Sequence, residues 1–297
     1  MFLKDIMKIK VYPLQGEWES VCYRIMMDAV FFKITLVLYL GGTVLFLAYL
    51  VSRKEALSTF SIGATALGFC AHLLALLIRT IQSGYLPLTN LTEAMSFFSW
   101  ALVLTFLGVE YRYRIHVLGS FVLPLALVSI IPAAALPTAA KSLDPQLQST
   151  WLLIHTPLAL LGVVSFAMAF VMGVMYLIQE RLLKSKRFNS LYYKLPSLDL
   201  LDDLNRKAVY LGFPLLTLGI LTGALWGKYA WGSYWNWDPK QTLTLVTWFF
   251  YLVVLHGRLT VGWRAKKAAY LAIIGFLGVI FAFVVGTFLV KGLHTFV

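Results

Sequence analysis

The run WLLIHTPLALLGVVSFAMAFVMGVMYLIQE, residues 151–180, decides the fold class of this chain. It contains no charged side chain before Glu180. A helix needs only about 20 apolar residues to cross the hydrocarbon layer of a membrane. Thirty residues in helical geometry are about 45 Å long, so this segment is expected to span a bilayer and to project beyond it. The run therefore predicts a transmembrane helix.

Similar apolar windows recur along nearly the whole chain. The 297 residues are 60% hydrophobic and only 13% charged, with a mean hydropathy of +0.80, which excludes an ordinary soluble protein. No alternating pattern suggests a membrane β-barrel. We therefore predict an all-α, polytopic transmembrane helical bundle of about eight spans. The expected spans are residues 31–51, 58–81, 92–109, 115–135, 151–180, 207–227, 240–257 and 268–291.

No stretch is long and polar enough to form a separate soluble domain. We expect residues 1–30 to form an N-terminal segment of uncertain role, without a clean signal-peptide pattern, and residues 31–297 to form the bundle. The two cysteines, Cys22 and Cys70, form no CxxC motif. A thiol relay or a zinc site therefore has little support.

The net charge of +12 is interpreted as a signature of membrane topology. In a soluble protein such a charge would suggest nucleic acid. Here one set of alternating loops holds fifteen lysines and arginines, and the opposite set holds five. The positive-inside rule places the richer set in the cytoplasm or its equivalent, so both termini and the loop at 226–242 should face outside. Five basic residues within the first 33 argue against this placement for the N-terminus.

The loop KYAWGSYWNWDPKQT, residues 228–242, gathers aromatic side chains in a polar segment. Single tryptophans commonly mark a membrane interface. Trp231, Trp235 and Trp237 fall within seven residues, which is more than an interfacial belt needs. Such a cluster forms a flat apolar surface with N–H donors at its rim, suited to a planar aromatic ligand. We therefore expect an extracytoplasmic tryptophan-rich loop with a binding role.

The end of this loop also predicts the start of a helix. In WDPKQ, Asp238 is suited to the N-cap, Pro239 to the first helical position and Gln241 to the capping-box partner. The aromatic surface would then lie on a helix N-terminus, which attracts carboxylates. Lys228 and Lys240 flank the loop and could add full positive charges.

Two histidines are expected near the tryptophan-rich loop. His155 lies at the outer start of span five, and His294 follows the outer end of span eight. Each alone is compatible with an interfacial residue. Together they could supply two axial ligands to haem iron, beside a planar surface with a cationic rim. His116 lies in a basic loop, and we assign it no ligand role.

His72 and His256 lie within predicted spans two and seven. One interpretation is a histidine hydrogen-bonded across a helix pair. The other is a second bis-histidine haem site inside the bundle. Helical rise places His72 roughly 15 Å below the outer end of its span and His256 roughly 24 Å below the start of its helix, a mismatch of about 9 Å. Both interpretations stay open.

The stretch WGSYWNWDPKQT resembles the WWD signature of haem-handling membrane proteins. Its context is similar to the CcsA (ResC-type) family of the System II cytochrome c biogenesis pathway. The supporting stretches are PLTNLTEAMSFFSW (87–100), WLLIHTPLALLGVVSF (151–166), WFFYLVVLHGR (248–258) and the terminal KGLHTFV. One departure is Gln241, where the family would be expected to show Glu.

The resemblance implies a function. Members deliver haem b at or across the membrane and join its vinyl groups to the CxxCH thiols of apocytochrome c on the extracytoplasmic side. It implies axial ligation by His155 and His294, a transmembrane pair His72 and His256, and a platform of Trp231, Trp235, Trp237 and Asp238. It also implies a CcsB/ResB-type partner and an integral protein of the cytoplasmic (inner) membrane, or of the thylakoid membrane in a plastid.

No catalytic acid–base pair or nucleophile is evident in the outer loops, so we expect catalysis of thioether formation by positioning alone. Basic residues on the outer side, Arg79, Lys228 and Lys240, are candidates to hold the haem propionates. Three other functions stay open: a haem exporter or carrier without synthase activity, a b-type haem electron-transfer subunit, and a transporter of a non-haem compound.

Overall fold

The computed structural model describes residues 15–52, 54–135, 147 and 149–289, and within these ranges it contains helices and no strand. The long helices are α1 (Gln15–Val51), α2 (Ala56–Ser83), α3 (Leu91–Tyr113), α4 (Gly119–Ala135), α5 (Thr150–Lys184), α7 (Leu198–Trp231), α8 (Pro239–His256) and α9 (Ala265–Val284). The short segments are η1 (His116–Leu118), α6 (Ser190–Lys194), η3 (Gly257–Val261) and η4 (Val285–Leu289). The predicted all-α fold is confirmed.

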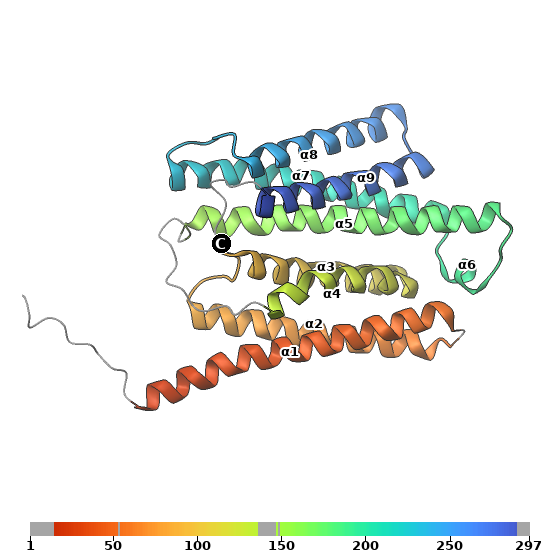
Figure 1. Cartoon of the computed structure of the whole chain (residues 1–297). Helices are drawn as coiled ribbons and strands as arrows, with labels where there is room; N and C mark the ends of the chain where they lie inside the picture. Colours follow the sequence, from red (N-terminus) through yellow and green to blue (C-terminus); the bar gives the residue numbers. More distant parts are fainter. Residues whose placement is uncertain (1–14, 53, 136–146, 148, 290–297) are drawn as a thin grey trace, which may run out of the picture.

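Seven of the described helices are long and apolar enough to cross a membrane. The predicted span at 115–135 corresponds to η1 and α4, and its apolar part, His116–Ile131, is shorter than the others. With 17 residues, α4 is about 26 Å long, slightly less than the thickness of the hydrocarbon layer. It nevertheless runs back alongside α3, so the chain still alternates between the two ends of the bundle (Figure 1).

Figure 1 shows α5 at the centre of the bundle, with α1 to α4 on one side and α7 to α9 on the other. The connections α1–α2, α3–α4, α5–α7 and α8–α9 lie at one end, which we call the basic end because these loops carry the richer set of lysines and arginines. The connections α2–α3 and α7–α8 lie at the opposite end, which we call the tryptophan end. The loops rich in lysine and arginine therefore lie together at one end of the bundle, as the charge pattern predicts.

The packing of α5 against α7 is the most extensive contact between helices. Its seam is formed by glycines. A Cβ atom added to Gly162 of α5 would lie 3.0 Å from the backbone N of Leu216, and one added to Gly219 of α7 would lie 3.0 Å from the Cα of Ala159. Small residues of this kind let two backbones approach closely in a membrane, where helix association depends on packing.

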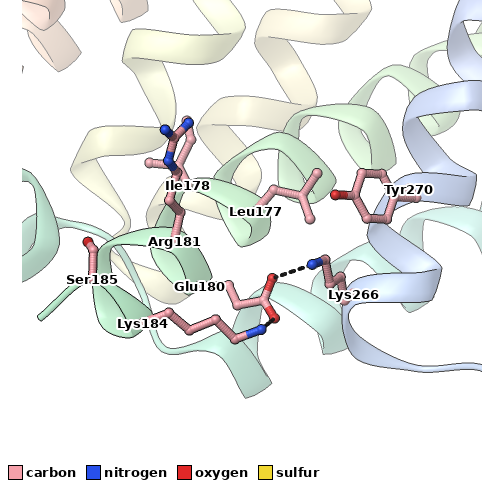
Figure 2. A pocket seen from close by; sticks show the side chains of 8 residues that line it. All are labelled: Leu177, Ile178, Glu180, Arg181, Lys184, Ser185, Lys266 and Tyr270. Atoms are coloured by element: carbon pink, nitrogen blue, oxygen red, sulfur yellow. Dashed lines mark hydrogen bonds and ion pairs between the residues drawn. The ribbon is translucent and has the colours of Figure 1, made fainter.

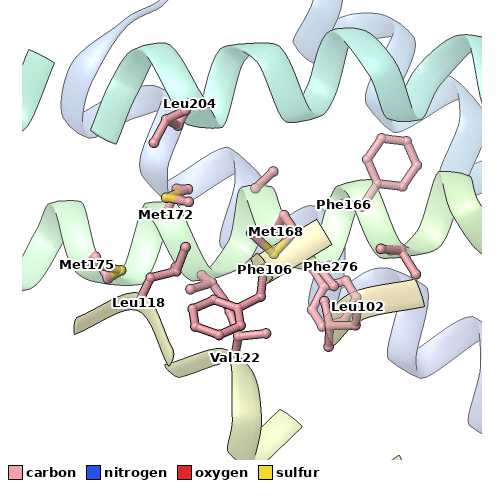
Figure 3. Packing of buried hydrophobic residues seen from close by; sticks show 14 of the residues in the cluster. Leu102, Phe106, Leu118, Val122, Phe166, Met168, Met172, Met175, Leu204 and Phe276 are labelled. Carbon is pink, nitrogen blue, oxygen red and sulfur yellow. The ribbon is translucent and has the colours of Figure 1, made fainter. Parts of the chain in front are cut away.

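The buried core extends from α5 to both groups of helices. Figure 3 shows Met168, Met172 and Met175 along α5, with residues of α3 and α4 to one side and Leu204 of α7 to the other. All four side chains are buried. Methionine is unbranched and adapts to irregular gaps, which suits a helix that packs against several neighbours at once.

Two corners at the tryptophan end have the same construction. Gly84 ends α2 with φ +74°, and Gly232 ends α7 with φ +75°. This left-handed conformation suits glycine and stops each helix. Six residues after each glycine an N-cap starts the next helix: Asn90 accepts a hydrogen bond from the backbone of its helix, and so does Asp238.

The third residue of each following helix completes the corner. Glu93 Oε2 accepts from the backbone N–H of Thr89 at 3.0 Å, and Gln241 Oε1 accepts from that of Asn236 at 3.0 Å. The prediction that Asp238 and Gln241 cap the helix is confirmed, although the Gln241 amide reaches two residues before the N-cap. A neutral amide and a carboxylate can both accept this bond.

At the basic end, Lys194 of α6 attaches the α5–α7 connection to α1. Its ammonium donates to the carbonyls of Tyr49 and Ser52 and lies 4.0 Å from the centroid of the Tyr49 ring. The carbonyls at a helix C-terminus have no partner within the helix and carry partial negative charge. Lys194 satisfies two of them, and desolvation by burial lowers the pKa of its ammonium.

We expect Lys194→Met to lower the free energy of unfolding by about 2 kcal/mol, because it removes charged hydrogen bonds and a cation–π contact but keeps the side-chain length. Thermal unfolding of the detergent-solubilised protein measures this change. Lys54→Met is the control, since Lys54 is an exposed lysine of the same corner whose ammonium has no hydrogen bond or ion pair with another described residue. Equal stability of the two variants would show that the Lys194 contacts contribute nothing.

Candidate functional site at the tryptophan end

His155 is held in a defined orientation near the start of α5. Ser149 caps this helix by accepting a hydrogen bond from the N–H of Trp151 at 3.2 Å. One turn later, Nδ1 of His155 lies 2.7 Å from the carbonyl O of Gly219 on α7. A carbonyl only accepts, so Nδ1 carries the proton, and in the neutral ring the lone pair belongs to Nε2. Histidines that bind metals are commonly oriented in this way.

The imidazole of His155 also stacks on an indole. The rings of His155 and Trp226 are nearly parallel, with an interplanar angle of 11° and centroids 6.2 Å apart. Trp226 is buried at the end of α7 that leads into the loop, and its ring meets the edge of Trp231 at 4.9 Å. Three aromatic rings therefore connect α5 with the tryptophan-rich loop.

The position of His155 depends on a glycine in the opposite helix. A Cβ atom added to Gly223 would lie 2.7 Å from Cε1 and 2.8 Å from Nδ1 of His155. Any side chain at 223 would force the imidazole to move away from Gly219. The two glycines are four residues apart in GILTG, residues 219–223, which is the small-residue spacing found where transmembrane helices pack closely.

The loop between α7 and α8 exposes its last tryptophan. Trp237 has φ +54° and is 71% exposed, and its ring meets the edge of Trp235 at 5.8 Å. The left-handed conformation is rare for a bulky residue. The next residue, Asp238, is buried and starts α8, and Thr242 donates a hydrogen bond to the carbonyl of Trp237. These contacts hold the strained backbone in place.

Basic side chains at this end differ in their surroundings. Lys228 donates to the carbonyl of Gly232 at 2.9 Å and lies over the ring of Tyr234. Lys240 is half-buried where α8 begins, and a Cβ added to Gly286 would lie 2.8 Å from its Cγ. Arg79 lies farther away, on α2.

The guanidinium of Arg79 lies between two carboxylates. It is 3.7 Å from Asp28 of α1 and 3.7 Å from Glu93 of α3. Glu93 is 5% exposed, so this ion pair is largely shielded from solvent. Arg79 therefore connects α1, α2 and α3, which gives it a structural role beside its predicted contact with a propionate.

His72 is fully buried among α1, α2 and α3. Its Nε2 lies 2.9 Å from the hydroxyl of Ser96, and its Nδ1 lies 3.4 Å from the hydroxyl of Tyr39. Phe32 meets the ring edge-on at 6.0 Å. These contacts match a histidine hydrogen-bonded between helices, and both of its ring nitrogens face hydroxyl groups.

His256 has a different environment, because it is exposed at the end of α8, where the helix changes to the π-helical η3. Two residues later, Arg258 is 6% exposed and donates to Asn205 of α7, with Asp202 at 3.4 Å. The Arg258 contacts attach this part of the helix to α7 while His256 remains on the surface. Helix α8 packs against α7 and α9, on the side of the bundle opposite to α2, so His72 and His256 are not brought together.

Two further findings concern the predicted ligands. His294 lies outside the described residues. Among those that are described, no group of three or more histidine, cysteine, aspartate or glutamate side chains could hold a metal ion. Among the described residues, the candidate site consists of His155, Trp226 and the tryptophan-rich loop, which place one oriented imidazole beside aromatic surface.

Comparison with known proteins identifies the family of the chain. The profile of the family described as Cytochrome C assembly protein matches residues 88–294, which include α5, α7 and the tryptophan-rich loop. This chain belongs to the cytochrome c assembly protein family. The match begins three residues before α3 and covers His155, His256, His294 and the tryptophans at 231, 235 and 237.

Several relatives of this chain carry the name Cytochrome c biogenesis protein CcsA. The relative from Guillardia theta is 34% identical over 253 residues, which cover 79% of this chain and 84% of the relative. The relative from Porphyra purpurea is 32% identical over 82% of this chain and 89% of its own length. That from Prochlorococcus marinus (strain AS9601) is 33% identical over 75% of this chain and 80% of its own length.

One solved structure has a fold similar to that of this chain. The protein called Cytochrome c Heme Lyase CcmF superposes with a TM-score of 0.62 over 91% of this chain, at 19% sequence identity. This chain spans 47% of the length of that protein. At such low identity the likeness concerns the fold alone.

Sequence reasoning missed Trp226, Gly219 and Gly223. Trp226 is one tryptophan at a helix end, which by itself indicates only a membrane interface. The GILTG spacing was a usable signal, since two glycines four residues apart predict close helix packing. The sequence did not indicate that the partner helix would bring His155 to this seam.

We expect Trp237→Gly to be more stable than Trp237→Ala by about 1 kcal/mol, because only alanine retains the cost of a Cβ atom in a left-handed backbone. Both variants lose the same ring, so the difference isolates the backbone effect. Thermal unfolding in detergent measures it. If the alanine variant is as stable as the glycine variant, the loop does not hold residue 237 in this conformation.

Proposed function

We propose that this protein binds haem b at the tryptophan end and, with a CcsB/ResB-type membrane partner, presents it for covalent attachment to the CxxCH motif of apocytochrome c. Membership of the cytochrome c assembly family supports a role in cytochrome c biogenesis. In this proposal the tryptophan end and the C-terminus face the extracytoplasmic side of the cytoplasmic membrane, or of the thylakoid membrane in a plastid.

The observation that carries the proposal is the orientation of His155. Its Nδ1–H donates to Gly219, which leaves the lone pair on Nε2, the arrangement expected of an axial ligand. Trp226 stacks on the imidazole and limits its rotation. A ligand fixed in both tautomer and ring plane loses little freedom when it binds iron, which favours binding.

The tryptophan-rich loop would form the platform for the porphyrin. Trp231, Trp235 and Trp237 supply aromatic surface, and Trp237 is the most exposed of the three. Asp238 would act indirectly, because it caps α8 and so fixes the point where the loop meets the helix. The helix N-terminus, together with Lys228 and Lys240, would place positive charge near the propionates.

His294 would provide the second axial ligand of this outer haem. The family match extends to this residue, and the C-terminal part of the chain follows η4. Lys240 packs against Gly286 of η4, eight residues before His294, so the beginning of α8 and η4 approach the same region. Two protein ligands would protect the iron until the histidine of CxxCH replaces one of them.

The covalent step is the addition of a thiol to a vinyl group. A carbon–sulfur bond forms, and the thiol hydrogen is transferred to the neighbouring vinyl carbon, so no atom is lost. No side chain described at the tryptophan end is placed as an acid–base pair for this step. The protein would act by holding the vinyl groups where two incoming cysteines meet them, and such positioning can supply a large part of a rate enhancement.

His72 and His256 would act separately in this chain. His72 lies inside the α1–α3 group with hydroxyl groups at both nitrogens, so binding a haem there would require these contacts to open. His256 is exposed on the outer surface of α8 and could bind iron if a second ligand came from a helix of the partner. We therefore propose His256 as the transmembrane ligand that the partner completes.

Two alternatives make different predictions. A haem carrier without synthase activity would bind haem but give no covalent cytochrome when co-expressed with the partner and an apocytochrome. A b-type electron-transfer subunit would be reduced reversibly by quinol and would not need Trp231, Trp235 or Trp237. Covalent haem in the co-expressed cytochrome, lost when the three tryptophans are replaced together by leucine, would favour the proposed synthase over both.

We expect His155→Ala to reduce the haem bound at the tryptophan end of the purified complex at least about tenfold, and Gly223→Ala to reduce it by about 10- to 100-fold by displacing the imidazole. Absorption spectra of the purified protein measure haem. Gly278→Ala is the matched control, because a Cβ at that helical glycine meets no atom within 4 Å. Unchanged haem and cytochrome maturation in a His155→Ala, His294→Ala double variant would eliminate the proposed ligand pair.

The two transmembrane histidines should respond differently to substitution. In the complex with the partner, His256→Ala should remove the haem that His155→Ala retains. His72→Ala should lower thermal stability without changing the haem spectrum, because the hydrogen bonds of His72 join three helices. Adding imidazole should restore haem only to a variant that lost an axial ligand. Rescue of His72→Ala by imidazole would contradict this assignment.

A further inference from the structure

A hollow lies at the basic end, far from the tryptophan-rich loop, where the end of α5 meets the start of α9. Its volume is about 600 Å³ and it is open to the surroundings. The lining residues are Leu177, Ile178, Glu180, Arg181, Lys184, Ser185, Lys266 and Tyr270. Figure 2 shows Lys184 of α5 and Lys266 of α9 reaching the Glu180 carboxylate, and Arg181 directed away from it at the edge of the hollow. Nothing in the proposed haem chemistry uses this hollow.

Ion pairs within the protein hold two of the positive charges of the hollow in place. Glu180 Oε1 lies 2.6 Å from the ammonium of Lys184, and Oε2 lies 3.9 Å from that of Lys266 (Figure 2). One carboxylate therefore holds two cations from different helices side by side. Arg181 forms no side-chain hydrogen bond or ion pair within the part of the chain that the structure describes. Three cations and one anion leave a net charge of +2 for an anionic group.

The apolar part of the lining distinguishes this hollow from a site for a soluble ion. Leu177, Ile178 and the ring of Tyr270 lie beside the charged groups. All three belong to helices that are long and apolar enough to span a membrane. A ligand with an anionic head and an apolar tail would match both parts of the lining.

The depth of the hollow matches the headgroup layer of a bilayer. Leu177 and Lys184 lie 26 and 33 residues after Trp151, which is about 39 and 50 Å along a straight helix. A bilayer is about 40–45 Å thick including its headgroups. With Trp151 at one interface, the hollow lies at the level of the phosphates of the opposite leaflet.

We propose that this hollow binds the phosphate of an anionic phospholipid, such as phosphatidylglycerol, whose acyl chains follow the surface of α5 and α9. Arg181, Lys184 and Lys266 bind the phosphate, and Leu177, Ile178 and Tyr270 contact the beginning of the chains. A zwitterionic lipid is disfavoured, because its choline group adds a positive charge beside three cations. The bound lipid connects the basic end of α5 to that of α9.

The test uses the full chain purified in detergent and mixed with phosphatidylglycerol or phosphatidylcholine, with native mass spectrometry to count bound lipids. The variant R181Q/K184Q/K266Q is compared with K186Q/R187Q/R264Q, which removes three exposed basic residues of the same end outside the hollow. A basic residue near an anionic lipid contributes about fivefold in affinity, so the first variant should lose phosphatidylglycerol by roughly a hundredfold. The second should behave as the unmodified protein.

The single variant Arg181→Gln keeps the test valid if the triple variant does not fold, because it leaves the Glu180 ion pairs intact and should lower phosphatidylglycerol retention about fivefold. Equal loss in both triple variants, or equal retention of the two lipids, would overturn the proposal. Displacement of phosphatidylglycerol by millimolar inorganic phosphate would show a site for free anions and would overturn the assignment to a lipid.

Discussion

The close approach of α5 and α7 is the constraint on which the candidate site depends. Glycines at 162 and 219 bring the two backbones together, so the carbonyl of Gly219 comes within hydrogen-bonding distance of His155. The space above Gly223 admits the imidazole, and Trp226 covers its face. A wider helix pair would leave the histidine free to rotate. The packing that stabilises the bundle therefore also sets the tautomer of the predicted ligand.

The two ends of the bundle use their polar residues differently. At the tryptophan end, caps and left-handed glycines stop the helices within short corners, so aromatic side chains are presented on a backbone that is held at both sides. At the basic end, lysines and arginines bind carbonyls, carboxylates and aromatic rings, as Lys194 does with α1. One end thus presents aromatic surface, and the other presents basic side chains.

Much of the fold could be predicted because a membrane constrains a helix by length and hydropathy alone. Such windows predict the spans, and a local pattern that needs no distant partner predicts the Asp238 cap. The start of the short helix α4 is harder to predict, because the apolar run at 115–135 begins with the separate segment η1. The sequence could not decide whether His72 and His256 face each other, because the depth of a residue along its helix does not show which helices are neighbours.

By itself, the sequence determined the all-α membrane fold, which loops lie at the same end of the bundle, the helix start at Asp238 and the clustering of tryptophans. These features follow from local composition and spacing, which act within one segment at a time. Only the tertiary structure decided that Trp226 and Gly219 would meet His155, that His72 would be enclosed by α1 and α3, and that His256 would remain on the surface. These outcomes depend on which helices pack together, and that choice is made by the fit of surfaces far apart in the chain.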